Sequence, residues 1–406
     1  MTGNRVAALA ASLCLATVLW LAPGSGVRAA PPSACTALAT QIDALPPGPG
    51  FLASFPTAPA GPLGQTAFLY DNALAVLALV GCGDAQRARR IGDAMLNALD
   101  HDRFWHDGRL RNGYAAGASA VPVKLSGWWD SQQNRWVEDR YQVGSDTGNM
   151  AWAMLALLSL DGQSPSYRQG ALRVGHWVAE NRDDRGAGGF SGGTFGHEPQ
   201  PETVRWKSTE HNTDLTAAFA WAARLTGDPE WSQLAHRADA FVQSLWTPSC
   251  SCFAVGTGDD GTTANPMLAL DAEIWPVLAL PQAQSRFPDA FNTALTRLSV
   301  DQGLAYSQVK DGVWTEGTAQ AALVAALTGQ DALASRLLAA LAAMQDADGT
   351  YLATSKASLP TGFTLPTDPG KPRLYFRLPH LAATAWVALA VTRFNPFTGQ
   401  RGLPGL

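Results

Sequence analysis

Hydrophobic and polar positions along the chain alternate between two kinds of helical segment. One kind is apolar on nearly all sides, rich in Ala, Leu and Trp, and begins in a short polar stretch. The other kind is amphipathic, with Arg and Gln along one face. Segments of the first kind span residues 66–80, 145–160, 209–225, 265–280, 315–327 and 379–391; those of the second span 33–45, 84–99, 166–181, 229–246, 286–298 and 331–344.

A helix that is apolar all round is buried, whereas an amphipathic helix covers a core. Six buried helices that alternate with six amphipathic ones predict an all-α fold, an (α/α)6 barrel of six helical hairpins with an inner and an outer ring. We expect residues 31–406 to form it as a single catalytic domain. Inner helices joined through outer ones run parallel, so their N-termini gather at one end. An open α-solenoid has the same local pattern and is the structural alternative.

Residues 1–30 have the pattern of a secretory signal peptide. Arg5 precedes an apolar stretch at 6–21, and small residues follow up to Ala30. We predict cleavage near Ala30 and a secreted or periplasmic, soluble protein. The net charge of −5 without basic runs disfavours a nucleic-acid partner. No later stretch is apolar and long enough for a membrane span, and we expect a monomer.

Four cysteines remain after cleavage, and an exported protein is expected to pair them. Three pairings are possible, and we favour Cys35 with Cys82, which would tie the N-terminal segment to the first hairpin. Cys250 and Cys252 are too close in sequence for an easy bridge. A zinc site is the alternative, but no suitably spaced His pair lies nearby, so neither a metal nor a cofactor is predicted.

The densest chemistry lies in residues 205–215, directly before an apolar helix. Similar polar starts open the other apolar segments, and they supply four candidate catalytic carboxylates: Asp71, Asp146, Glu210 and Glu316. Cleavage of a glycosidic bond requires one protonated carboxyl and one carboxylate. Glu210 and Glu316 are each preceded by a Trp in the same motif and suit the acid, whereas Asp146 and Asp71 lie in small-polar helix starts and suit the base. Helix capping is the structural alternative for each.

Aromatic and polar residues expected at the same end would bind the substrate, because sugars present flat apolar faces edged by hydroxyl groups. The candidates are Trp128, Trp129, Trp136, Arg140, Tyr141, Trp206, Lys207, His211, Asn212, Asp271 and Trp314. Trp residues inside the apolar helices, such as Trp152 and Trp275, are predicted to pack in the core. His380 lies among Leu residues and is expected to be a wall residue. The Gly-rich stretch 186–196 is expected to form a flexible lip.

Three motifs carry a resemblance to a known family. Trp-Lys-Ser-Thr-Glu-His-Asn at 206–212, Gly-Ser-Asp-Thr-Gly-Asn-Met-Ala-Trp at 144–152 and Val-Trp-Thr-Glu-Gly-Thr-Ala-Gln at 313–320, together with the hairpin pattern, resemble the six-hairpin glycosidase superfamily. The resemblance implies a sugar-active (α/α)6 toroid with acid and base carboxylates where the inner helices begin. The first motif is also similar to a segment of the N-acylglucosamine 2-epimerase family, which shares this fold and uses His acid/base chemistry.

The sequence therefore predicts a secreted glycoside hydrolase of an oligo- or polysaccharide. A second hypothesis is a lyase or unsaturated-uronyl hydrolase on acidic glycans, with Arg side chains holding the substrate carboxylates and His211 or Tyr141 moving the proton. A third is a glycan-binding protein without catalytic activity, since a fold does not fix a function.

Overall fold

The computed structural model describes residues 33–365 and 368–404. The predicted signal peptide lies outside the described residues. Within the described part the chain forms 13 α-helices and several short antiparallel strand pairs. None of the described helices combines the length and the apolar character needed to cross a membrane. The described residues belong to one compact unit.

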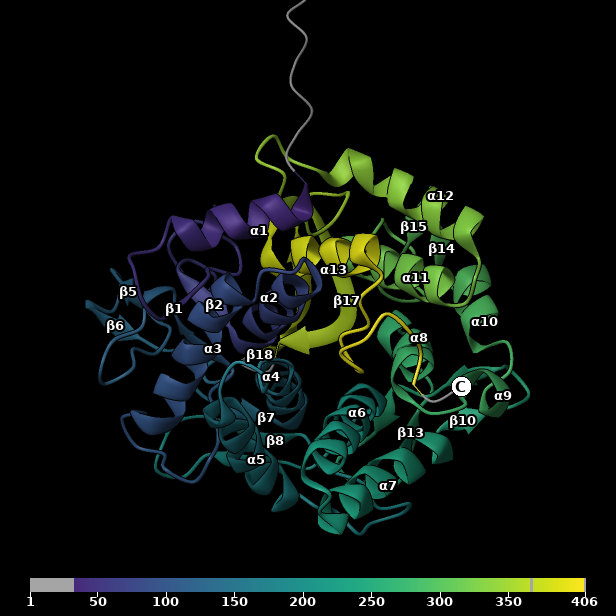
Figure 1. Cartoon of the computed structure of the whole chain (residues 1–406), viewed down its shortest axis with the longest axis horizontal. Helices are drawn as coiled ribbons and strands as arrows, with labels where there is room; N and C mark the ends of the chain where they lie inside the picture. Colours follow the sequence, from purple (N-terminus) through teal and green to yellow (C-terminus); the bar gives the residue numbers. More distant parts are fainter. Residues whose placement is uncertain (1–32, 366–367, 405–406) are drawn as a thin grey trace, which may run out of the picture. The chain divides into compact units, whose positions relative to one another are not determined.

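Six helices of the described chain form an inner ring (Figure 1). They are α2 (Leu69–Gly81), α4 (Thr147–Ser159), α6 (Thr209–Thr226), α8 (Leu270–Ala279), α11 (Thr315–Leu327) and α13 (Leu381–Thr392). Each contacts the next one in this order, and α13 contacts α2. Nearly all their side chains are buried, as the apolar pattern predicts.

Amphipathic helices pack outside this ring. They are α1 (Ala34–Asp43), α3 (Ala85–Asp100), α5 (Pro165–Ala179), α7 (Pro229–Ser244), α10 (Ala290–Leu298) and α12 (Asp331–Leu341), which continues into the 3-10 turn Ala342–Met344. The predicted helix at 286–298 is interrupted: the short α9 (Ala283–Arg286) ends before Pro288, and Asp289 adopts a left-handed conformation with φ 63°.

One hydrogen-bonding pattern recurs where the inner helices begin. The first backbone N–H of each inner helix donates to a backbone carbonyl in the segment that leads into the next inner helix. The donor and acceptor pairs are Leu69 with Asn112, Thr147 with Gly192, Thr209 with Val255, Leu270 with Tyr306, Thr315 with Ala353 and Leu381 with Ser54. The last pair returns to the segment before α2, so these bonds form a cycle. At these helix starts, backbone carbonyls accept the hydrogen bonds that capping side chains accept at many other helix starts.

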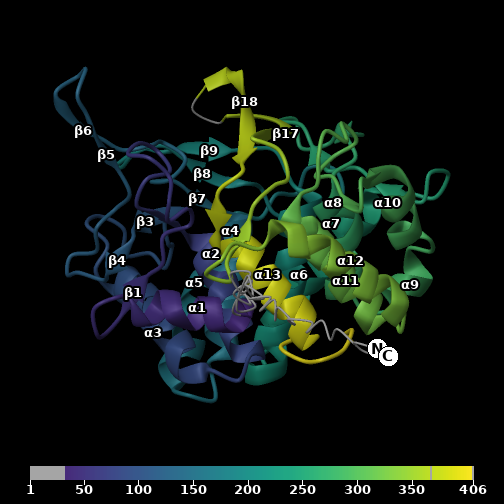
Figure 2. The same cartoon turned by 90° about the horizontal axis from the view of Figure 1, so that it is seen from above.

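The strands lie in the segments that connect these helices. The pairs are β1 (Gly50–Phe51) with β4 (Gly117–Ala118), β2 (Thr66–Phe68) with β3 (Gly113–Ala115), β5 (Trp128–Asp130) with β6 (Arg135–Val137), β10 (Trp246–Thr247) with β11 (Cys252–Phe253), β12 (Gly256–Thr257) with β13 (Ala264–Asn265), β14 (Ser299–Val300) with β15 (Gly303–Leu304), β16 (Tyr351–Leu352) with β19 (Pro379–His380), and β17 (Ser358–Leu365) with β18 (Asp368–Phe376). A three-stranded sheet joins β7 (Ser145–Asp146), β8 (Gly193–Phe195) and β9 (Glu202–Val204). Figure 2 shows that β8, β9 and the β17–β18 hairpin rise on the same side of the helices.

The four cysteines of the described chain form two disulfide bonds. Cys35 and Cys82 are bonded, with their Cα atoms 5.9 Å apart, which confirms the favoured pair. Cys250 and Cys252 are also bonded, with Cα atoms 5.2 Å apart, so the expectation that they are too close was wrong. Ser251 between them has a φ of 47°, and this left-handed turn lets both side chains project to the same side.

Tryptophans fill the interior of the ring, as predicted. Trp152 has its ring centroid 5.3 Å from that of Trp275 and 5.8 Å from that of Trp386. Phe397, in the segment after α13, packs against this group with its ring 5.0 Å from Trp152 and 5.8 Å from Trp275. The interior is therefore closed by aromatic side chains beyond the first turns of the inner helices.

Candidate active site

Carboxyl groups gather where the inner helices begin. The group consists of Asp71, Asp146, Glu210, Asp214, Asp271 and Glu316, and it is called the carboxylate cluster below. Except in α6, which Ser208 caps, the inner helices begin without a hydrogen bond from a capping side chain. The backbone cycle described above satisfies their first N–H groups instead. Helix capping therefore does not account for these carboxylates.

His380 joins two members of the cluster. Its Nε2 atom lies 3.2 Å from Oδ2 of Asp71, and its Nδ1 atom lies 3.3 Å from Oε1 of Glu316, too poorly aligned for a hydrogen bond. The ring of Phe55 stacks on the imidazole with centroids 4.2 Å apart. Burial alone would lower the pKa of His380, but the two carboxylates outweigh it and raise the pKa to about 10. The imidazole is thus a buried cation between two anions.

This assignment corrects the expectation that His380 is a wall residue. Its Leu neighbours do face the core, but the preceding strand β19 directs the imidazole at the start of α13 toward α2 and α11. Tyr70 extends the same contacts: its hydroxyl donates to Oε2 of Glu316 at 3.3 Å and accepts from Nε1 of Trp386 at 2.9 Å. We call Asp71, His380, Glu316 and Tyr70 the His380 group.

Asp146 and Glu210 form a second part of the cluster. Burial is the largest effect on both carboxyl groups and raises each pKa to about 7. Glu210 keeps some exposed surface, yet the protein surrounds its carboxyl group. The negative charge of Glu210 further raises the pKa of Asp146, whereas the Asn112 amide and the Arg373 cation lower it. For Glu210 the opposing influences are Arg373, which lowers the pKa, and Glu316, which raises it.

Asp214 and Asp271 lie deeper in the same part. Burial and the nearby charges of other carboxyl groups raise both pKa values well above the usual range. Neither oxygen of Asp214 has a hydrogen-bond partner, and the amide of the buried Gln320 has none at either atom. A buried ionised carboxylate without a partner is costly, so these groups hold protons at neutral pH. Asp146, Glu210, Asp214 and Asp271 are called the Glu210 group.

Arg373 is the cation that acts on the Glu210 group, and the sequence patterns gave no sign of it. It lies on β18, with its guanidinium 5.9 Å from the centre of the Tyr141 ring. Its charge lowers the pKa of Glu210, Asp146 and Asp271. A helix-period search does not find residues on a hairpin, and nothing local marks this Arg among its neighbours.

Several predicted substrate-binding residues do lie beside the cluster. Tyr141 accepts a hydrogen bond from Asn149 at 3.4 Å, and its pKa is raised by burial and by the charge of Asp146. The imidazole of His211 lies 5.4 Å from the Trp206 ring and 3.3 Å from Oγ1 of Thr147. Burial lowers the pKa of His211 to about 4, so this imidazole is neutral at neutral pH.

Trp314, which precedes α11, packs against two tyrosines. Its ring centroid is 4.9 Å from Tyr306 and 5.6 Å from Tyr375. The charges of Glu210, Asp271 and Glu316 raise the pKa of Tyr306 beyond the effect of burial, which places that phenol near the cluster. The two tyrosines were not predicted, since they lie in connecting segments.

Two of the predicted substrate-binding residues form hydrogen bonds to backbone groups of the protein. Lys207 is fully buried, and its Nζ donates to the carbonyls of Arg185 and Gly188 at 2.6 and 2.8 Å. The Asn212 amide bonds the N–H and carbonyl of Phe190 at 2.9 and 3.1 Å, as Asn72 on α2 does for Leu52. These bonds hold the Gly-rich stretch 186–196, which also supplies β8, so it is a tethered segment and not a free lip.

Four other predicted residues lie outside the cluster. Arg140 pairs with Glu202 at 2.5 Å and stacks over Phe195, 4.5 Å from its ring centre. Trp128, Trp129 and Trp136 belong to the β5–β6 hairpin at the edge of the ring (Figure 2). Among the described residues, no group of three His, Cys, Asp or Glu side chains is arranged to hold a metal ion.

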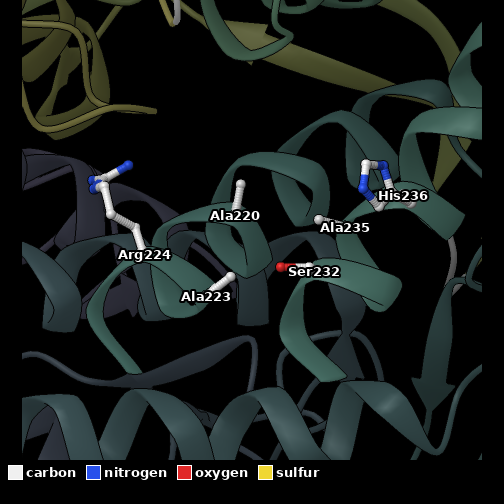
Figure 3. A pocket seen from close by; sticks show the side chains of 6 residues that line it. All are labelled: Ala220, Ala223, Arg224, Ser232, Ala235 and His236. Atoms are coloured by element: carbon white, nitrogen blue, oxygen red, sulfur yellow. The ribbon is translucent and has the colours of Figure 1, made fainter. Parts of the chain in front are cut away.

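A hollow of about 350 Å³ lies between α6 and α7. Figure 3 shows the side chains that line it. Ala220, Ala223, Arg224, Ser232, Ala235 and His236 line it. It lies toward the C-terminal end of α6, whereas Glu210 lies at the N-terminal end. The hollow has one cation and one imidazole but no carboxylate, so its chemistry is unrelated to that of the cluster.

Solved structures share the architecture of this chain. A glycosidase variant in complex with glucose matches with a TM-score of 0.58 at 15% identity, covering 89% of this chain and 95% of that one. A GH76 alpha-mannanase from Bacteroides thetaiotaomicron matches with a TM-score of 0.54 at 12% identity, covering 90% and 95%. The cellobiose 2-epimerase from Spirochaeta thermophila gives 0.60 at 15%, covering 88% and 93%.

The fold is that of the six-hairpin glycosidases. No protein-family model and no curated protein sequence matches the chain, so the likeness rests on structure. Both hydrolases and an epimerase have this six-hairpin fold, so the fold by itself does not choose between cleaving a glycosidic bond and rearranging a sugar.

Proposed function

We propose that this protein is a secreted glycoside hydrolase on an (α/α)6 barrel, in which Glu210 and Asp146 are the catalytic acid and base. The observation that carries the proposal is the pair of interacting carboxyl groups whose pKa values are each raised to about 7. The cyclic contacts of the inner helices support a closed barrel. The two disulfides favour an oxidising compartment.

Two carboxyl groups that repel each other's charge lose their protons in separate steps. With both pKa values raised to about 7, the pair can hold one proton and one negative charge near neutral pH. Glu210 is the better proton donor, because the neighbouring charge of Glu316 favours its protonated form. Asp146 is the better base, because the Asn112 amide favours its ionised form, whereas Arg373 acts on both groups. We therefore propose Glu210 as the catalytic acid, for which the sequence left both Glu210 and Glu316 as candidates.

In the proposed reaction, Glu210 gives its proton to the glycosidic oxygen as the bond to the anomeric carbon breaks. Asp146 removes a proton from the attacking water, or attacks that carbon itself. Positive charge develops on the sugar ring in the transition state. Asp71 and Glu316 face the His380 cation, so they suit electrostatic stabilisation better than proton donation.

The test uses the mature protein and a panel of neutral oligo- and polysaccharides, with new reducing ends as the measurement. Glu210→Gln and Asp146→Asn should each lower the rate about 10²–10⁴-fold. Glu230→Gln is the matched control, since Glu230 occupies the first turn of an outer helix and is exposed. Full activity in both cluster variants would refute the assignment, and glycan binding without turnover would favour a binding protein.

A second candidate function follows from His211. Its imidazole is neutral at neutral pH and lies at the edge of the Glu210 group, so it can accept a proton from a carbon next to a carbonyl. Such a step is used by lyases and by sugar epimerases. Products that absorb in the ultraviolet, or a changed sugar without new reducing ends, would favour this candidate. Either outcome should then depend on His211→Gln more than on Glu210→Gln.

A further inference from the structure

Two tryptophans face solvent on the β5–β6 hairpin. Trp129 and Trp136 pair directly across the two strands, and their exposures are 59% and 55%. Directly opposed residues project from the same face of an antiparallel pair, so the two indoles lie side by side. Both views place this hairpin at the edge of the described fold, apart from α6 and α8 (Figures 1 and 2).

The local structure holds these indoles in place. A Cβ atom on Gly127 would lie 2.5 Å from Nε1 of Trp136, so the indole rests directly against the Gly127 backbone. The turn is fixed by Asp130, which accepts from the N–H groups of Gln132 and Gln133 at 2.8 and 3.0 Å. Arg135 then donates to the side chain of Gln133 at 2.8 Å. The aromatic pair is therefore a built surface with polar groups at its edge.

Charge and area exclude two other occupants. The hairpin pairs Asp130 with Arg135 and the chain is acidic overall, so the hairpin lacks the cluster of basic residues that an anionic membrane surface attracts. Two half-exposed indoles offer less than about 300 Å². A stable contact between two copies of the chain needs about 800 Å² from each partner.

We propose that Trp129 and Trp136 bind a neutral glycan chain at a site separate from the carboxylate cluster. Flat sugar faces match the exposed indoles in size and polarity, and their hydroxyl groups can bond Gln132, Gln133 and Arg135. Two indoles in a row fit at least two consecutive sugar units. The inference rests on the proposed function, because the glycan is taken to be the polymer that the enzyme cleaves. Such a site would hold a long substrate near the enzyme between cleavage events.

The experiment measures binding in the absence of turnover. Glu210→Gln protein is mixed with the neutral polysaccharide that gave most reducing ends or, if none did, with a panel of insoluble neutral polysaccharides, and the bound fraction is measured. Adding Trp129→Ala and Trp136→Ala should weaken binding about 10-fold, as expected for the loss of two aromatic contacts. Adding Trp129→Phe and Trp136→Phe instead should restore most of it. Val309→Ala is the control, because Val309 is equally exposed on another loop.

In active protein, the double Ala variant should lose about 10-fold more activity on the polymer than on a trisaccharide. Equal binding by the double Ala variant, or equal losses on both substrates, would overturn the proposal. So would a change in vesicle binding or in oligomeric state caused by the same substitutions. Failure of the proposed hydrolysis is a different result: no reducing ends form, while the Trp-dependent binding is still measurable.

Discussion

The His380 group and the Glu210 group lie at the same end of the inner ring, but they differ in the charges that surround their carboxyl groups. In the His380 group, a buried imidazolium lies within 3.2 Å of one carboxylate and 3.3 Å of another. In the Glu210 group, buried carboxyl groups raise one another's pKa, and the cation Arg373, on a hairpin, lowers the pKa of Asp146, Glu210 and Asp271. The two carboxylates keep the imidazole of the first group cationic, whereas burial and mutual repulsion favour the protonated forms of the carboxyl groups in the second.

This difference suits the His380 group to stabilising the fold and the Glu210 group to transferring protons. A fully paired charge is stable but has no proton to give at neutral pH. An unpaired buried carboxyl group weakens the fold yet holds a transferable proton near pH 7. Opposite effects on stability are therefore expected from neutralising substitutions in the two groups.

The largest effect is expected in the His380 group. His380→Gln should lower the free energy of unfolding by about 3–5 kcal/mol at pH 6, because it leaves two buried carboxylates without their cation. The pKa of His380 is raised in the folded state, to about 10 from an ordinary 6.5, so its stabilisation is complete below pH 6.5 and is lost as the pH rises toward 10. Urea denaturation at pH 6 and pH 9 measures both effects.

His236→Gln is the control for this substitution, since His236 is exposed on α7. It should change stability very little at either pH. A His380→Gln loss that stayed constant between pH 6 and pH 9 would show that the imidazole is not the buried cation described here.

A change of opposite sign is expected in the Glu210 group. Asp214→Asn should raise the free energy of unfolding by about 1–3 kcal/mol at pH 8. The pKa of Asp214 is raised in the folded state, so the unfolded chain ionises first and the wild type loses stability as the pH rises above about 4. At about pH 3, below the ordinary pKa of Asp, both states are largely protonated, and the variant should gain little. Thermal or urea denaturation at both pH values checks this.

Asp259→Asn, on an exposed loop, should be neutral at both pH values. Destabilisation of the Asp214→Asn protein at pH 8 would mean that Asp214 is ionised and paired, which would remove the contrast between the two groups.

The smallest effect concerns Arg373. Its cation lowers the pKa of both Glu210 and Asp146, so Arg373→Met should raise both values. Both limbs of the pH–rate profile should then move to higher pH, by up to about 1 unit. Arg377→Met, another exposed cation just after β18, is the control. An acid shift, or an equal shift in the control, would contradict the role given to Arg373.

Much of this fold could be predicted from periodicity. The apolar segment at 315–327 coincides with α11, and the other inner helices lie within a few residues of their predicted ranges. The carboxylates at the helix starts were also predicted, because polar residues that interrupt apolar helices are visible in the sequence. The role of Arg373 was not predictable, since its partners lie on other elements and are brought near it only by the hairpin.

His380 and Lys207 also show that local sequence does not reveal the partners of a side chain. A His flanked by Leu suggests packing, yet the fold places it between two carboxylates. A Lys in a motif rich in charges suggests substrate binding, yet it is buried against backbone carbonyls. In each case, local sequence gives the residue type, whereas the partner belongs to a segment far away along the chain.

The sequence by itself determined the helical hairpins, the two burial classes and the end of the ring where the polar groups gather, because these depend on local periodicity. Tertiary structure alone decided which carboxyl groups share a cation and which share a proton. That distinction depends on distances of a few ångströms between α2, α4, α6, α11 and α13, and electrostatic energies in a buried site change steeply over such distances. The cycle of backbone hydrogen bonds fixes those distances, and it forms only when the last inner helix meets the first.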